Sequence, residues 1–402
     1  RMVAEALAAR SATKKKLKAA VARLEELRDT DSPERRKQLQ LIDALDNRQL
    51  ALKVSANSVY GYLGASSAAS DKTVASTVTN KGREMLMESC DTSRETAKTI
   101  VCKSTGEPVG DMTLVYGDTD SLMVTLSNVT TPDDAWHAGV QMSDAVTNAY
   151  AACGHEAKKL EMEKCYLPYI LFAKKRYCGI KWDENKDGDV VSRGVSYSGT
   201  ANKRRDTCTL VHRIYDDMTH VLLHDRDRSK CMQLFHEWMR KVVVADVPYA
   251  DLQITRQVKS KYSNPNLAQA IVVAKQRARE QGSETKSGDR VKMIYVQGPP
   301  GAKVGELAED ADYAQQHKLP PDMVTYILNQ IHTPTLSLLE LLDPNPKRLL
   351  DYYVDEAKRI RSGTPRITDF LNKHRASSGA STTTVPTAVS VVDLHVPTTA
   401  AR

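Results

Sequence analysis

Residues 116–121 read Tyr-Gly-Asp-Thr-Asp-Ser and lie between two short β-prone runs, 113–116 and 122–125. Two such runs joined by a turn that contains Gly and Asp predict a β-hairpin. The hairpin would carry the carboxylates of Asp118 and Asp120 together at its tip. This stretch constrains the chain most, because it fixes a local fold and a local chemistry at once.

Two carboxylates at a hairpin tip can converge on a cation. Their oxygens suit hard divalent ions such as Mg²⁺, which proteins usually hold with one or two carboxylates plus substrate phosphates. Asp and Gly are also common turn residues, so a bare Asp-x-Asp is more often an ordinary turn. The full hexamer between apolar runs favours a metal site, with Asp120 as the preferred direct ligand and Asp118 beside it. Glu161 and Glu163 fall on a strand expected nearby in sequence and are either neighbours of this site or plain surface carboxylates.

The hexamer resembles the third polymerase motif of family B DNA polymerases. Residues 53–64, KVSANSVYGYLG, resemble the second motif of that family, and residues 160–182 resemble its palm segment containing Lys-Lys-Arg-Tyr. The motifs occur in family order, and the similarity spans about residues 10–342. The resemblance implies template-directed DNA synthesis, in which a deoxynucleoside triphosphate donates a nucleotidyl group to a primer 3′-hydroxyl. It also implies a two-metal mechanism with two Mg²⁺ ions.

The first motif of the family, an Asp followed by Ser-Leu-Tyr-Pro-Ser, does not occur in this sequence. Nor does any segment resemble the 3′→5′ exonuclease domain. In the family, the carboxylate that completes the metal site with Asp118 and Asp120 belongs to that first motif. We therefore expect a C-terminal fragment of a larger polymerase, inactive in templated synthesis by itself.

Composition sets looser bounds. Hydrophobic residues make up 41% of the 402 residues and charged residues 27%, which is typical of a globular protein. The formal net charge of +7 weakly favours polyanionic partners. No apolar run approaches the ~20 residues that span a bilayer, so no membrane contact is expected.

The seven cysteines are dispersed and lack zinc-ligand spacing, which indicates reduced thiols and an intracellular location. The resemblance adds a contrast, because cellular replicative members of the family carry paired C-terminal cysteine modules that are missing here. We therefore expect a source such as a large DNA virus, and the nucleus or a viral replication site as the location.

The pattern predicts an α+β fold, and the resemblance implies the right-hand polymerase fold. Helical spacing over 2–28 and 34–59, with Ser32 or Asp31 as a cap and Pro33 at the first helical position, predicts a helical hairpin. The expected domains are helical-hairpin fingers at 1–60, a mixed α/β palm with an antiparallel sheet at 61–203, a mostly helical thumb at 204–362 and a disordered tail at 363–402.

The palm and thumb elements follow from local patterns. Palm helices are expected at 71–88 and 133–153. Palm strands are expected at 99–103, 113–116, 122–125, 159–166 and 177–182. Thumb helices are expected at 208–224, 229–243, 267–280 and 323–342, with a strand at 291–297.

The fingers carry the candidate nucleotide-binding residues. Lys53 and Asn57 share one face of the second helix, and Tyr60 lies on the next turn. The resemblance implies that Lys53 contacts the triphosphate and that Tyr60 packs near the nascent base pair. Arg10 and Lys14, four residues apart on the first helix, would face the triphosphate from across the hairpin. Several further lysines stand alongside these two, so a solvated basic face is the alternative for them.

Two basic segments are candidates for binding primer–template DNA. Strand alternation would send Lys175 and Tyr177 to one face and Lys174 and Arg176 to the other, a mix that fits contacts with the primer terminus. The alternative is a basic edge strand that resists aggregation. The second segment resembles the basic triplet at the thumb entry of the family, and its residues would touch the duplex backbone: Lys203, Arg204 and Arg205.

Near the C-terminus, Ile367, Phe370 and Leu371 have the spacing of a sliding-clamp-binding peptide, with Thr364 at the position usually held by Gln. The alternative is the last turn of a thumb helix. For the whole chain, the alternatives to a polymerase are a non-catalytic DNA-binding remnant and a coiled-coil interaction protein. The intact Asp118, Asp120 and Lys53 argue against a decayed remnant. A coiled-coil protein explains neither the Tyr-Gly-Asp-Thr-Asp-Ser hexamer nor the Lys-Lys-Arg-Tyr segment.

Overall fold

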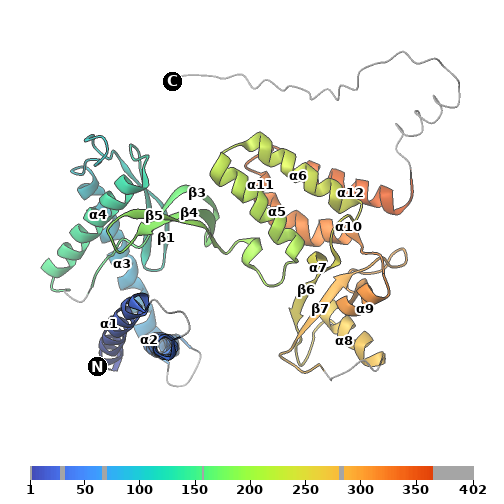
Figure 1. Cartoon of the computed structure of the whole chain (residues 1–402), viewed down its shortest axis with the longest axis horizontal. Coiled ribbons are helices and arrows are strands. Elements are labelled where there is room, and N and C mark those ends of the chain that lie inside the picture. The colour runs from blue at the N-terminus through green and yellow to red at the C-terminus, as the bar shows by residue number, and fades with distance from the viewer. Residues whose placement is uncertain (1, 28–31, 66–69, 156–157, 280–284, 365–402) are drawn as a thin grey trace, which may run out of the picture. The chain divides into compact units, whose positions relative to one another are not determined.

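The computed structural model describes residues 2–27, 32–65, 70–155, 158–279 and 285–364 (Figure 1). The chain divides into two compact units, one of residues 1–167 and 181–194 and one of residues 168–180 and 195–402. Helices occur together with antiparallel strand pairs, which confirms the α+β class. The candidate clamp-binding residues Ile367, Phe370 and Leu371 lie outside the described residues.

The first unit begins with a helical hairpin. Helix α1 spans Met2–Glu26 and helix α2 spans Pro33–Gly64. The Ser32 side chain caps α2 by accepting a hydrogen bond from the backbone N–H of Arg35 at 3.1 Å, and Pro33 occupies the first turn. The predicted cap and both helices are therefore confirmed.

The seam between α1 and α2 follows a strict heptad rhythm. In α2 the half-buried positions alternate in steps of three and four residues, while the positions between them are exposed. This is the spacing of a coiled coil, in which the repeat keeps one stripe of side chains against the partner helix. The stripe consists of Arg35, Gln38, Ile42, Leu45, Gln49, Leu52, Ala56, Val59 and Leu63.

The rest of this unit is a small layer of helices on a β-hairpin. Helix α3 spans Lys72–Ala97 and helix α4 spans Pro132–Ala152, while strands β1 and β2 span Met112–Asp118 and Ser121–Leu126. Cys90 and Ala97 of α3, Ala138 and Met142 of α4, and Met112 of β1 belong to one buried cluster. The predicted strands at 113–116 and 122–125 and the helix at 133–153 are confirmed.

Strands β3 (Cys165–Ala173), β4 (Arg176–Glu184) and β5 (Val190–Ser198) form a second sheet in the order β3-β4-β5. The strand expected at 159–166 is wrong over most of its length, because the strand starts at Cys165. β3 contains Pro168, and a proline usually argues against a strand because it lacks a backbone N–H. Here it is tolerated because β3 lies at the edge of the sheet. The backbone N–H and C=O of Leu160 instead bond to the Thr147 hydroxyl of α4, at 3.0 and 3.1 Å.

The strand expected at 99–103 is also wrong. Here the chain makes a tight turn, with hydrogen bonds from Cys102 N–H to Glu107 C=O at 2.8 Å and from Gly106 N–H to Cys102 C=O at 2.9 Å. Such a short reversal leaves room for a single isolated bridge, between Val101 and Pro108.

The second unit is mostly helical and surrounds a large core that includes Tyr215, Phe235, Met293, Tyr326 and Leu350. Its helices are α5 (Thr209–His220), α6 (Arg228–Val243), α7 (Tyr249–Leu252), α8 (Ala268–Ala278), α9 (Ala311–Gln316), α10 (Met323–Tyr326), α11 (His332–Leu339) and α12 (Pro346–Arg361). Two π-helical turns, Val221–Asp225 and Ile327–Ile331, extend α5 and join α10 to α11. A three-stranded antiparallel sheet consists of β6 (Ile254–Gln257), β7 (Arg290–Tyr295) and β8 (Ala308–Asp310).

The four predicted thumb helices and the strand at 291–297 are confirmed. Helix α12 was missed, although Leu350, Tyr353, Val354 and Ala357 recur at helical spacing and are all buried. Among the described residues, no helix has both the length and the apolar composition that crossing a membrane requires.

The Lys-Lys-Arg-Tyr segment forms the corner between β3 and β4. Lys174 and Lys175 are the two turn residues, and Lys175 adopts a left-handed backbone with φ of 62°. Strand alternation therefore does not run through all four residues, and that expectation was wrong. Gly199, with φ of 58°, lies so close that a Cβ on it would sit 2.2 Å from the carbonyl oxygen of Lys175.

We expect Gly199→Ala to destabilise the protein more than Gly301→Ala does. Both glycines have positive φ, and at Gly301, with φ of 83°, a Cβ meets nothing within 4 Å. The control should cost about 1–2 kcal/mol for the left-handed backbone alone. Gly199→Ala adds a collision with a carbonyl oxygen that cannot move freely. Urea unfolding followed by circular dichroism measures the difference, and equal midpoints for the two variants would contradict the close approach.

Thiol chemistry should single out Cys153. It is exposed, whereas Cys90, Cys102, Cys165, Cys178, Cys208 and Cys231 are buried. Burial raises the pKa of Cys178 and Cys231 to about 12 and that of Cys165 and Cys208 to about 11. Because the thiolate is the nucleophile, these thiols should resist alkylation near pH 8. Mass spectrometry after brief iodoacetamide treatment should find Cys153 modified first, and rapid labelling of a buried cysteine in folded protein would contradict the burial.

Candidate functional site

The tip of the β1–β2 hairpin carries the two candidate catalytic carboxylates. Asp118 ends β1 and pairs with Ser121, which starts β2, so Thr119 and Asp120 form the turn. Thr119 takes a left-handed backbone with φ of 58°. The Asp120 N–H bonds to the Asp118 C=O at 2.7 Å, and the Thr119 hydroxyl donates to the Asp118 carboxylate at 3.0 Å. These contacts fix the turn that presents Asp120.

The two faces of this hairpin differ. Leu122, Val124 and Leu126 of β2 pack against the buried cluster of α3 and α4. Gly117 pairs with Leu122 and faces Leu86 of α3, where a Cβ would lie 3.8 Å from the leucine side chain. Because side chains alternate along a strand, Asp118 and its partner Ser121 point to the opposite face.

The chemistry of the tip fits a hard cation whose coordination sphere is completed by substrate phosphates. Asp118 is half-buried and Asp120 is exposed, and no described residue donates a hydrogen bond to the Asp120 carboxylate. Carboxylate oxygens are ligands that Mg²⁺ prefers, often with only one or two from the protein. Within the described ranges, no group of three or more His, Cys, Asp or Glu side chains is placed to hold a metal ion. The tip therefore offers part of a coordination sphere rather than a closed cage.

Glu161 and Glu163 do not lie on a strand. Both are exposed, in an irregular stretch between α4 and β3, while Met162 between them packs against Gly139 of α4. Exposure alternates over residues 160–164, as it would on a strand. The regular strand meant to aim these glutamates at the metal site is absent from these residues.

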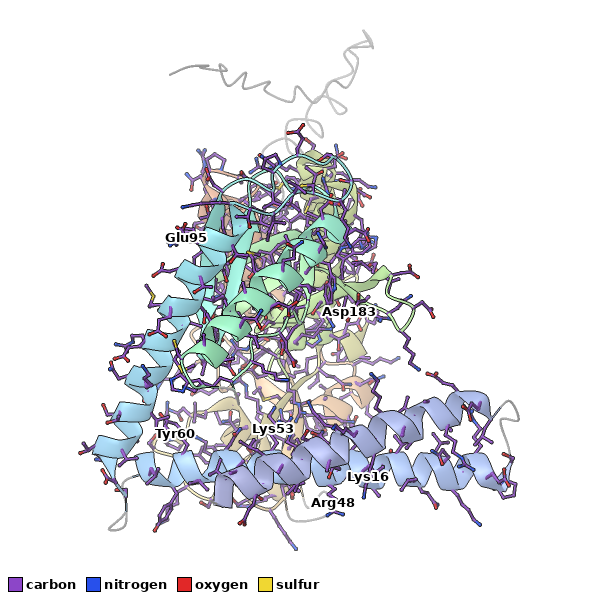
Figure 2. All side chains as sticks on the ribbon, turned by 90° about the vertical axis from the view of Figure 1, so that its left-hand side faces the viewer. Lys16, Arg48, Lys53, Tyr60, Glu95 and Asp183 are labelled. Carbon is purple, nitrogen blue, oxygen red and sulfur yellow. The ribbon has the colours of Figure 1, made fainter. Side chains whose placement is uncertain are left out.

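The α1–α2 hairpin has two distinct sides. In the heptad frame, Lys53 and Tyr60 of α2 and Lys14 of α1 follow directly after seam positions, which places them along the same edge of an antiparallel pair. Figure 2 shows Lys53 and Tyr60 on one edge of the hairpin and Arg48 on the other. Lys53 and Asn57 are exposed, as binding to a triphosphate requires.

Arg10 differs from Lys14. It occupies a seam position, is half-buried, and donates a hydrogen bond from Nε to the Gln49 side chain at 3.4 Å. Although Arg10 and Lys14 are four residues apart, Arg10 lies in the seam and Lys14 is exposed. Tyr60 meets Thr79 of α3 through its hydroxyl at 3.2 Å, which ties this residue of α2 to the next helix.

The side chains of the two basic segments differ in the contacts they make within the protein. Tyr177 packs its ring 5.5 Å from that of Tyr169. Arg204 makes two hydrogen bonds to Asp206, at 3.0 and 2.9 Å, and this pairing lowers the pKa of the Asp206 carboxyl. Lys203 lies over the Tyr197 ring at 4.9 Å.

Arg205 is exposed and has no ion-pair partner in the part of the chain that the structure describes. Of the triplet, it is the residue most open to a phosphate. Sequence reasoning missed the partners Gln49, Thr79, Tyr197 and Asp206. The heptad position of Gln49 was a readable signal, and the Arg204-x-Asp206 spacing was a weak one. The other two contacts depend on tertiary structure.

Comparisons with known proteins agree with these motifs. Residues 1–342 match the model of DNA polymerase family B. The DNA polymerase delta catalytic subunit of Oryza sativa subsp. japonica is 33% identical over 311 residues, which cover 76% of this chain and 27% of that protein. The corresponding subunit of Schizosaccharomyces pombe is 31% identical over 329 residues, or 80% of this chain and 28% of that protein.

Among solved structures, the family B DNA polymerase from the hyperthermophilic archaeon Pyrobaculum calidifontis is 24% identical and has a TM-score of 0.45, with 83% of this chain and 38% of that chain covered. The chain spans about a quarter of the length of the two curated relatives. The match over residues 1–342 and the identity to these relatives establish that the chain belongs to DNA polymerase family B.

Proposed function

We propose that this chain supplies fingers, palm and thumb to an enzyme that carries out template-directed DNA synthesis. The substrates are primer–template DNA and a deoxynucleoside triphosphate. The observation that carries the proposal is the hairpin tip with Asp118 and Asp120, in a chain that belongs to family B. The proposed domains are fingers at 1–60, palm at 61–203, thumb at 204–362 and a tail at 363–402.

At the tip, Asp120 and Asp118 would hold Mg²⁺. Two bound metal ions stabilise the attacking and leaving oxygens of an in-line displacement. The role of this chain is to place the carboxylates: the left-handed Thr119 turns the backbone, and its hydroxyl bonds to the Asp118 carboxylate at 3.0 Å. The third carboxylate of the family belongs to the first motif, which is not in this sequence. The chain by itself is therefore expected to be inactive.

On the fingers, Lys53 would neutralise triphosphate charge, with Lys14 on the same edge of the hairpin. Asn57 lies one turn after Lys53 on the exposed surface, and Tyr60 one turn further. Arg10 would act less directly, because its guanidinium bonds to Gln49.

The residues proposed to hold DNA are Lys174, Lys175, Arg176, Tyr177, Lys203, Arg204 and Arg205. Contacts of this kind with phosphates carry no sequence information and weaken with salt. Replication in the nucleus or at a viral replication site is the proposed setting. A tail peptide with Ile367, Phe370 and Leu371 is the proposed contact with a sliding clamp.

In the polymerase that carries this chain, Asp120→Asn should lower primer extension by about 100-fold or more, the scale of losing one electrostatic stabiliser of a transition state. The substitution removes a ligand charge with almost no change in shape, so duplex binding should persist. Asp118→Asn should also impair extension severely. Rapid-quench extension assays and duplex-binding titrations measure the two effects.

Asp111→Asn is the matched control, since Asp111 is exposed just before β1, at the other end of the hairpin. It should leave extension unchanged. If Asp120→Asn kept extension within about tenfold of wild type, a loss under about 1.4 kcal/mol, the metal assignment would be wrong. The chain would then be better described as a DNA-binding remnant.

Lys53→Ala should raise the KM for the nucleotide and lower the incorporation rate. Loss of a hydrogen bond to a charged group, worth about 1.5–3 kcal/mol, corresponds to about 10- to 150-fold in kcat/KM. Arg48→Ala on the other edge of the same helix should leave both parameters unchanged. Single-nucleotide incorporation kinetics would refute the role of Lys53 if the two variants behaved alike.

A further inference from the structure

The edge of the α1–α2 hairpin opposite to Lys53 holds a groove of about 680 Å³. We call it the outer groove. Its position follows from the heptad frame, in which Lys16, Arg23 and Leu41 directly precede seam positions, as Arg48 does on the edge that Figure 2 shows away from Lys53. The outer groove is lined by Lys16, Ala19, Ala20, Arg23, Leu27, Glu34, Lys37, Gln38, Leu41 and Leu45.

Small side chains open the outer groove. Ala19 and Ala20 leave space on α1 where larger residues would fill the seam. The Gln38 amide is held by a hydrogen bond to the Ala20 carbonyl at 2.7 Å, so it does not spread over the gap. Leu27 and Leu45 form an apolar floor, and Leu41 beside them is 48% exposed.

The rim of the outer groove is cationic. Lys16, Arg23 and Lys37 are exposed, and across the described ranges none of the three forms an ion pair. Among the described residues that line the groove, Glu34 is the single carboxylate. A ligand with an apolar centre and negative flanks would therefore match both the floor and the rim.

The hairpin itself is under-packed. Helix α2 is 32 residues long and has no buried residue. A third helix laid along the outer groove would bury the leucines that two helices leave half-exposed, since side-chain ridges of one helix fit the grooves of others. None of the described residues that line the outer groove is aromatic, so single-stranded DNA would find phosphate partners there but no side chain on which to stack its bases.

We propose that the outer groove is the docking site for an acidic amphipathic helix of a partner protein. Apolar residues of that helix at i, i+3, i+4 and i+7 would cover Leu27, Leu41 and Leu45. Its flanking carboxylates would reach Lys16, Arg23 and Lys37. Docking leaves the proposed nucleotide side free, because Lys14, Lys53 and Tyr60 lie on the opposite edge of the hairpin.

A binding titration tests this without any measure of synthesis. The probe is a fluorescent peptide of about 21 residues, three heptads with Leu at the two seam positions and Glu at the positions that flank them. Fluorescence anisotropy with the full chain should show saturable binding that weakens with salt. Lys16→Glu combined with Arg23→Glu should weaken binding by about tenfold or more, because both charges at the rim change sign.

Lys15→Glu combined with Lys18→Glu is the matched control, with the same change of charge on the same helix but no residue in the lining. It should bind within about twofold of wild type, as expected for charges outside the contact. A second probe of the site, Leu41→Gln, removes apolar surface at an exposed position where folding should not be disturbed. This substitution should also weaken binding of the peptide.

The proposal is wrong if the wild-type chain does not bind the peptide at about 100 μM, well above a typical micromolar dissociation constant. It is equally wrong if both double variants lose binding alike, which would indicate non-specific attraction. A thymidine oligonucleotide that loses affinity only with the Lys16 and Arg23 changes, while the peptide does not, would instead make the outer groove a nucleic-acid site.

Discussion

The packing of the β1–β2 hairpin against α3 and α4 is the contact on which the candidate catalytic site depends. Leu122, Val124 and Leu126 bury one face of a two-stranded ribbon that would be marginal alone in water. Since side chains alternate along a strand, burial of this face sends Asp118 to the other one. Burial of these apolar residues on one face therefore sets the direction of the Asp118 carboxylate on the other face.

A β-bulge adds to this aiming. The register between the two strands shifts between Leu114 and Tyr116, so that Val115 has no direct partner. In a regular strand of the same residues, without the bulge, alternation would continue through Val115, and Asp118 would share the face of Leu114 and point into the helices. The bulge therefore allows the apolar residues before it to face the helices while Asp118, after it, faces away from them.

The coiled-coil seam plays the corresponding part in the α1–α2 hairpin. Its strict steps of three and four residues give the hairpin two edges of different character. Lys14, Lys53 and Tyr60 line one edge, and the cationic outer groove lies along the other. A loss of register between α1 and α2 would alter both edges together. The polar seam contacts, Arg10 with Gln49 and Gln38 with the Ala20 carbonyl, oppose such a slip.

The sequence by itself determined much of this protein. The capped helical hairpin, the β1–β2 hairpin and most helices within residues 204–362 were readable from spacing and turn chemistry, because these depend on contacts between near neighbours in the chain. The polymerase motifs were recognised by their resemblance to family B. The tertiary structure decided what distant contacts control. It moved the start of β3 to Cys165, since the Thr147 hydroxyl on α4 takes both backbone bonds of Leu160. Tertiary structure also decided that Lys174 and Lys175 form the turn between β3 and β4, with Gly199 packed against it. In the same way, it decided that Arg10 lies in the seam between α1 and α2. A pattern of residue types records which side chains prefer to be buried, but only packing between distant segments decides which partner buries them.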